Sequence, residues 1–122
     1  MELVPVTEEY YEFIRRLRVD ENNAEGFLEK ASITKKQQEE YMKKHGENYF
    51  IALLYGKPVG YVGVIDNDIR ICTDHDAKGS GVGSFMLSEI KRIYPSATGR
   101  IKKNNPASQR LFEKCEVPYK LI

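Results

Sequence analysis

The sequence has no excess of charge of either sign. Its 122 residues include 19 lysines and arginines and 18 aspartates and glutamates, which gives a formal net charge of +1. Because the positive and negative charges nearly cancel, the protein has no overall attraction to a phosphate backbone, and we expect no nucleic-acid partner. No apolar run approaches the roughly 18 residues that a membrane-spanning helix needs, so we expect no membrane partner either.

Cysteine is also scarce. The two cysteines, Cys72 and Cys115, lie far apart and form no C-x-x-C pair, so we expect reduced thiols and no metal site. The first residues contain neither a basic region nor a long apolar run, which predicts a cytoplasmic protein without a secretory signal. The hydrophobic and charged fractions, 41% and 30%, are typical of a globular protein, and the length predicts one domain over residues 1–122.

Hydrophobic periodicity predicts short strands separated by turns and helices. Apolar or alternating runs predict strands at residues 3–6, 49–55, 59–65, 69–73, 97–102 and 117–122. Turns are expected at Gly56-Lys57-Pro58 and Asp66-Asn67-Asp68. Residues 20–32 are weakly patterned, and we expect there a loop or an irregular helical turn that contains Phe27 and Leu28.

Four helices are expected between these strands. Their predicted starts are Thr7, Thr34, Gly81 and Asn105. Thr34 and Gln37 have the spacing of a capping box, and Pro106 suits the first position of the last helix. Because a helix connects the strands at 69–73 and 97–102, that pair should be parallel, whereas the three central strands before it form an antiparallel meander. The chain is therefore expected to be an α/β sandwich with a mixed sheet.

One stretch is unusually rich in glycine. KGSGVGSFML, residues 78–87, places three glycines at alternate positions just before a predicted helix. It lacks the Gly-Lys-Ser/Thr end of a P-loop, and Ser84 and Met86 stand where a dinucleotide-binding fingerprint needs its third glycine. A glycine loop at a helix N-terminus still presents unpaired N–H groups that suit a phosphate. The stretch is thus either a tight turn or an anion site.

Two motifs together resemble the GNAT superfamily of N-acetyltransferases. Residues 78–83 are similar to the acyl-CoA loop of that family, and the stretch NPASQRLFEKCEV follows about twenty residues later. In this second motif the family positions are filled by Asn105, Ser108, Leu111, Phe112, Glu113 and Lys114. The resemblance covers essentially the whole chain. It implies a GNAT-like mixed sheet, with an antiparallel meander and a splayed parallel strand pair, flanked by about four helices.

The resemblance also implies acetyl-CoA as cosubstrate. The backbone of Ile71 and Thr73 would pair with the pantetheine amides, and Asn105 would cap its helix or hydrogen-bond the pantetheine arm. The residues implied at the pyrophosphate are Lys78, Gly79, Ser80, Gly81, Val82, Gly83 and Ser84. An oxyanion donor is expected among the backbone N–H groups near Thr73.

Acetyl transfer requires a neutral amine and a thiolate that can leave. An amine with a pKa of about 10.4 is only about 0.1% neutral near pH 7.4, so a base or a water relay helps. By resemblance Asp68 is the candidate base; a purely structural role in the Asp66-Asn67-Asp68 turn is the alternative. Phe112 replaces the tyrosine that protonates the thiolate in many relatives, which leaves Ser108 and Tyr119 as candidates for that role.

The C-terminal strand region is shortened relative to the family pattern, and Glu116-Val117 replaces its Gly-Phe pair. We therefore expect an open sheet edge, and either a homodimer that completes it or an accessible acceptor cleft. The favoured hypothesis is an N-acetyltransferase that acts on the primary amine of a small molecule, with amino sugars among the candidates, by direct attack in a ternary complex. A protein acetyltransferase, a CoA-binding module with little turnover, and a protein without CoA are the alternatives.

Overall fold

The elements follow the predicted order in the computed structural model, which describes residues 1–19 and 33–122. The strands are β1 (Glu2–Pro5), β2 (Tyr49–Leu54), β3 (Lys57–Ile65), β4 (Asp68–Thr73), β5 (Gly99–Ile101) and β6 (Tyr119–Leu121). The helices are α1 (Tyr11–Val19), α2 (Lys35–His45), α3 (Val82–Ile93) and α4 (Pro106–Lys114), with 3-10 turns η1 (Glu8–Tyr10), η3 (Gly46–Asn48) and η4 (His75–Ala77). The prediction for Phe27 and Leu28 lies outside the described residues.

The meander is confirmed. Strands β1 to β4 form one antiparallel sheet in sequence order. The turn residues Tyr55, Gly56, Asp66 and Asn67 all have positive φ, as two-residue hairpin turns of type I′ require. The first turn was expected at Gly56-Lys57-Pro58, and this is wrong: Pro58 lies inside β3, beside a register shift that lets the sheet accept a proline.

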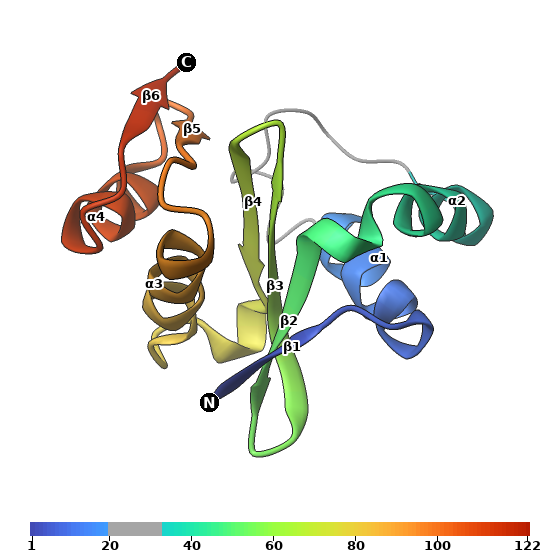
Figure 1. Cartoon of the computed structure of the whole chain (residues 1–122). Helices are drawn as coiled ribbons and strands as arrows, with labels where there is room; N and C mark the ends of the chain where they lie inside the picture. Colours follow the sequence, from blue (N-terminus) through green and yellow to red (C-terminus); the bar gives the residue numbers. More distant parts are fainter. Residues whose placement is uncertain (20–32) are drawn as a thin grey trace.

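Strands β4 and β5 are parallel, as predicted, but they meet at a single point. Asp68 and Thr98 form an isolated parallel bridge, and the Ile69 N–H donates to the Thr98 carbonyl at 2.9 Å. Beyond this bridge β5 pairs with β6, also in parallel. Figure 1 shows β5 and β6 standing apart from the four-stranded sheet, which is the splayed arrangement that the resemblance implied.

The four-stranded sheet is covered on both faces. Figure 1 shows α1 and α2 on one side of it and α3 and α4 on the other. One buried cluster joins the sheet to α3 through Val62, Val64, Ile69, Val82, Met86, Leu87 and Ile90; the other joins it to α1 and α2 through Ile14, Leu17, Met42, Ile51, Tyr61 and Cys72. Since side chains alternate along a strand, Asp68 and Arg70 lie on the same face as Cys72, which is the face of α1 and α2.

Two predicted helix caps are confirmed, and the third is wrong because its side chain makes no hydrogen bond to the helix backbone. Thr34 and Gln37 form both hydrogen bonds of a capping box, and the Asn105 side chain accepts from the Ser108 N–H at 3.3 Å. Thr7 precedes η1 but caps nothing, because its hydroxyl donates to the Glu9 carboxylate at 3.2 Å. Across residues 1–19 and 33–122, the helices are too short or too polar to cross a membrane.

Candidate active site

The glycine loop joins η4 to α3 through two left-handed residues. Gly79 and Gly81 have φ values of +86° and +85°, which glycine adopts without steric cost. A Cβ on Gly79 would meet no atom within 4 Å, and one on Gly81 would meet only Met1 Cε at 3.9 Å. The loop is therefore open on the outside, and its glycines are required by the backbone conformation rather than by lack of space.

The start of α3 is not capped by a side chain, because its N-cap residue is Gly81. Within the described residues, the N–H groups of Gly79, Gly81, Val82, Gly83 and Ser84 donate to no carbonyl. Ser80 differs from its neighbours, since its N–H and its hydroxyl both donate to the Ala77 carbonyl. The exposed Lys78 stands at the beginning of the loop, and its N–H donates to the carbonyl of His75. The loop thus provides a row of available N–H donors with one exception.

Gly83 has a different function from the two loop glycines. It lies in the first turn of α3, and a Cβ there would lie 3.2 Å from Leu111 Cδ2 and 3.7 Å from Thr73 Oγ1. The missing side chain therefore allows α3 to approach α4 and the end of β4 closely. This contact brings the loop, β4 and the second motif together.

The backbone of β4 has one edge towards β3 and one towards β5. The Asp74 N–H, just after β4, donates to the Val59 carbonyl in β3, whereas the Ile69 N–H donates to the Thr98 carbonyl just before β5. Because N–H directions alternate along a strand, the N–H groups of Ile71 and Thr73 point to the same edge as that of Ile69. In the described part of the chain β4 pairs with β5 only through the bridge at Asp68, so this edge is unpaired beyond Ile69.

The second motif places its side chains in unequal environments. Phe112 is only 3% exposed and packs on β5, where a Cβ on Gly99 would lie 2.4 Å from its Cε2 atom. Tyr119 contacts the Phe112 ring edge-on, and its hydroxyl donates to Glu113 at 2.6 Å. Ser108 is half-buried one helical turn before Phe112. Residue 112 is therefore a core residue, and the Tyr119 hydroxyl already has an acceptor.

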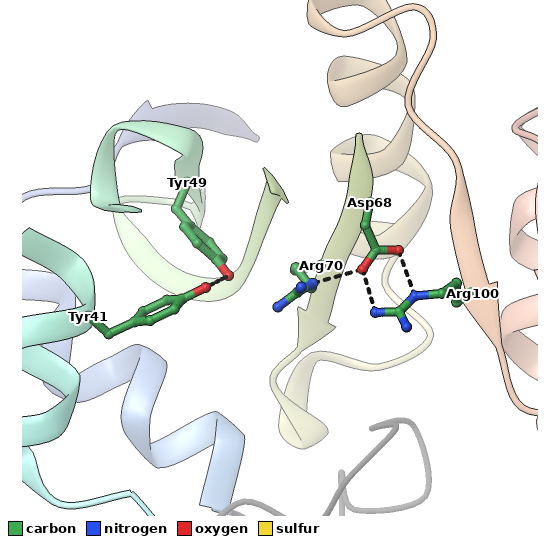
Figure 2. A network of polar contacts seen from close by, with 5 residues as sticks. All are labelled: Tyr41, Tyr49, Asp68, Arg70 and Arg100. Carbon is green, nitrogen blue, oxygen red and sulfur yellow. Dashed lines mark hydrogen bonds and ion pairs between the residues drawn. The ribbon is translucent and has the colours of Figure 1, made fainter. Parts of the chain in front are cut away.

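On the face of β4 that points to α1 and α2, Asp68 forms ion pairs with two arginines (Figure 2). The Arg70 Nε donates to Asp68 Oδ2 at 2.9 Å, and Arg100 donates its Nε and Nη2 to both carboxylate oxygens at 3.2 and 2.9 Å. Burial raises the pKa of Asp68, but the hydrogen bonds from Arg100 and Arg70 outweigh it, so the pKa lies below its usual value. A carboxylate held in this way is a weak proton acceptor, which counts against the prediction that Asp68 is the base.

Two tyrosines lie beside this ion-pair cluster. The hydroxyls of Tyr41 and Tyr49 are 2.8 Å apart, and Figure 2 shows Arg70 between this pair and Asp68. Burial, followed by the hydrogen bond to Tyr41, raises the pKa of Tyr49, so the phenol stays neutral. The Arg18 guanidinium lies 5.6 Å from the centre of the Tyr41 ring.

A hollow of about 330 Å³ lies next to Tyr41. It is lined by Arg18, Ile33, Gln37, Gln38 and Tyr41. Gln38 is 1% exposed, and neither polar atom of its amide has a hydrogen-bond partner among the described residues. In the described ranges no three His, Cys, Asp or Glu side chains lie close enough together to hold a metal ion.

Sequence reasoning did not identify Arg70, Arg100, Tyr41 or Tyr49 as site residues. Arg70 could have been found, because Asp68 and Arg70 are two residues apart on one strand and so share a face. Arg100 is 32 residues from Asp68, and only the pairing of β4 with Thr98 shows that the two side chains meet.

The site combines uncapped N–H donors at a helix start with an unpaired strand edge, and the sequence agrees with this arrangement. The model of the Acetyltransferase (GNAT) family matches residues 8–116. The chain belongs to this family. As a GNAT acetyltransferase it is an acyltransferase that uses acetyl-CoA.

Solved structures show the same fold for this GNAT acetyltransferase. A ribosomal-protein-alanine N-acetyltransferase from Brucella melitensis has a TM-score of 0.80 at 14% identity, over 93% of this chain and 82% of that one. A spermidine N-acetyltransferase from Vibrio cholerae, in complex with CoA and spermine, has a TM-score of 0.79 at 17% identity, over 93% of this chain and 78% of that one. A phosphinothricin acetyltransferase from Sinorhizobium meliloti, in complex with AcCoA, has a TM-score of 0.76 at 17% identity, over 93% of this chain and 72% of that one. No curated protein matches the sequence.

Proposed function

We propose that this GNAT acetyltransferase transfers an acetyl group from acetyl-CoA to the primary amine of a small molecule, by direct attack while both are bound. The observation that carries the proposal is the row of available N–H groups from Gly79 to Ser84, next to the unpaired edge of β4. These are the two features that an anionic, amide-containing cosubstrate needs.

The loop fits the pyrophosphate by its backbone. Its donors lie at the positive end of the α3 dipole, so they bind phosphate oxygens without many basic side chains. We assign this role to Gly79, Gly81, Val82, Gly83 and Ser84, with Lys78 as a mobile positive charge. Ser80 takes part only if its bond to Ala77 opens.

The pantetheine arm fits the unpaired edge of β4. The N–H groups of Ile71 and Thr73 point to this edge, and an amide-containing chain can pair there as a further strand would. When bound, acetyl-CoA supplies the thioester that the amine attacks and the thiolate that leaves. The backbone donors near Thr73 are the proposed oxyanion stabilisers, and Asn105, already the cap of α4, adds a polar side chain near the arm.

The two proton transfers are assigned to different places. The thiolate is assisted by Ser108 or a water that it holds, because Phe112 has no proton to give and Tyr119 donates to Glu113. The amine loses its proton to water near Asp68 rather than to Asp68 itself, since two arginines hold the pKa of that carboxyl low. Asp68 then acts by positioning Arg70 and Arg100.

The small-molecule acceptor is supported by the substrates of two similar structures. Two of the similar structures are acetyltransferases of spermidine and of phosphinothricin, which are small molecules, whereas the Brucella melitensis enzyme acts on a ribosomal protein. The deciding experiment incubates the protein with acetyl-CoA and a panel of small amines and peptides, and follows thiol release. Turnover with small amines supports the proposal; turnover with peptides alone, or with nothing, overturns it.

A homodimer is a further part of the proposal. β6 is an edge strand, and Leu121 on it is 44% exposed, so a second copy could pair along it. A molecular mass from light scattering tests this directly: the mass of two chains is expected, and the mass of one chain overturns it.

A further inference from the structure

The inference concerns the acceptor and rests on the proposed function. The cosubstrate groups assigned above lie along the unpaired edge of β4 and at the start of α3. An amine that attacks from the other face of β4 meets the side chains of Arg70 and Arg100, which flank the point where β4 and β5 diverge (Figure 2). The chemistry of these side chains therefore decides which amines can bind.

The cluster around this point is cationic. Asp68 is the carboxylate in it, and it receives three N–H···O hydrogen bonds from Arg70 and Arg100. Arg18 adds a third guanidinium, 5.6 Å from the centre of the Tyr41 ring. Among the described residues, two guanidinium groups on one carboxylate, with a third against the Tyr41 ring, favour an anion over a second cation.

Arg70 retains the donors that an anion needs. Its Nε donates to Asp68, but neither of its Nη atoms donates to any described residue, and its side chain is 39% exposed. Two Nη groups form the outer edge of the guanidinium, which binds a carboxylate through two parallel hydrogen bonds. Arg100 is different, because it already uses Nε and Nη2 on Asp68.

The tyrosine pair adds a neutral donor beside Arg70. Of two hydroxyls 2.8 Å apart, one donates to the other, so the second proton is available to a ligand. Tyr41 also lines, with Arg18, the open hollow of about 330 Å³, which Arg70 and Tyr49 do not line. Hydrogen-bond donors and positive charge thus lie on the same side of β4.

We propose that the acceptor is a small primary amine that carries a carboxylate, and that this carboxylate binds the Nη edge of Arg70 with help from the Tyr41–Tyr49 pair. The amine end of the same molecule then reaches the acetyl group beside β4. A polyamine fits the described residues less well, because the Asp68 oxygens that its far ammonium group would need are already bonded to two arginines.

The test compares acceptors that differ only in the group at the far end. 3-Aminopropanoate, 3-aminopropanamide and 1,3-diaminopropane share three carbons and carry an anionic, a neutral and a cationic end. 4-Aminobutanoate and 5-aminopentanoate with their amides, and alanine with alaninamide, extend the comparison to other spacings. 2-Aminoethylphosphonate separates a carboxylate site from a general oxyanion site.

We expect the best carboxylate to exceed its matched amide by about 10- to 100-fold in kcat/KM, the range of a charged hydrogen bond that is made or lost. Arg70→Met should remove this preference by raising KM for the carboxylate, with KM for acetyl-CoA unchanged. Arg70→Lys should restore part of it. Arg92→Met is the matched control, because Arg92 lies on α3 with a side chain 72% exposed and should leave the preference intact.

The outcomes separate this inference from the proposed function. If amides or diamines turn over as well as carboxylates, the inference is wrong and the proposed function stands. If no small amine turns over, the proposed function fails. The carboxylate site is then tested by calorimetry, which measures the binding of 3-aminopropanoate to the CoA-loaded protein. Binding that weakens in Arg70→Gln supports a carboxylate site, and no binding refutes it. A phosphonate preferred over every carboxylate also refutes the carboxylate proposal.

Discussion

The two proposed binding regions beside β4 are built from different kinds of group. Towards α3 the proposed cosubstrate site is made of backbone: N–H groups of a glycine loop and of an unpaired strand edge. Towards α1 and α2 the proposed acceptor site is made of side chains, chiefly Arg70, Arg100, Tyr41 and Tyr49. A backbone site accepts many sequences as long as its conformation is kept, whereas a side-chain site changes its ligand with one substitution.

The largest effect is expected where the backbone conformation is disturbed. Gly79→Ala and Gly81→Ala each place a Cβ in a left-handed residue, which shifts the loop away from the φ values of +86° and +85°. Loss of one charged hydrogen bond to the pyrophosphate should weaken CoA binding by about 10- to 100-fold, measured by calorimetry.

Gly56→Ala is the matched control for strain. Gly56 has a φ of +76° and no atom within 4 Å of an added Cβ, so the substitution is equally strained but lies in the β2–β3 turn. It should lower stability to a similar degree without changing CoA affinity. Equal affinity losses in all three variants would mean that the glycines only maintain the fold.

A smaller effect is expected at the leaving group. Ser108→Ala should lower kcat by about 10-fold, below the usual range for a well-placed general acid because a serine acts weakly or through water. KM for acetyl-CoA should not change. The measurement is the steady-state rate with the best small amine.

Phe112→Tyr provides the contrasting variant. Its new hydroxyl would be buried in the core beside Gly99, so we expect a loss of about 1–3 kcal/mol in the free energy of unfolding and no gain in kcat. A higher kcat in Phe112→Tyr, together with an unchanged rate in Ser108→Ala, would place the proton donor at residue 112 instead.

The smallest effect concerns the ion pairs of Asp68. The pKa of Asp68 is lowered in the folded protein, so its ionised form stabilises the fold above the unfolded value of about 4, and this stabilisation is lost as the pH falls through the folded pKa. Asp68→Asn should therefore lower the free energy of unfolding by about 1 kcal/mol at neutral pH, after allowance for the partial exposure of both arginines. The difference from the wild type should shrink in urea titrations below about pH 4.

Asp66→Asn makes the same chemical change at an exposed turn residue and should have little effect at any pH. Kinetics distinguish the two roles considered for Asp68. If it only positions Arg70 and Arg100, the pH profile of kcat/KM in Asp68→Asn keeps its shape near neutral pH. Loss of the acidic limb would identify Asp68 as the base after all.

The elements could largely be predicted from the sequence, because periodicity and capping are local. The Thr34–Gln37 capping box and the Asn105 cap are examples, since each depends on residues three apart. The turn before β3 was misplaced because Pro58 usually ends a strand, whereas here a register shift in the sheet accommodates it. Thr7 also had the right residue type for a cap but a nearer partner in Glu9.

The sequence by itself determined the α/β order, the family motifs and the glycine loop, because these depend on neighbouring residues and on the backbone freedom of glycine. Only the tertiary structure decided which side chains lie together on the α1 and α2 side of β4. Asp68 meets Arg100 across 32 residues because β4 and β5 touch at one bridge, and these contacts lower the pKa of a carboxyl that the family resemblance had made a candidate base. Contacts between distant residues depend on strand pairing and packing, which no local pattern encodes.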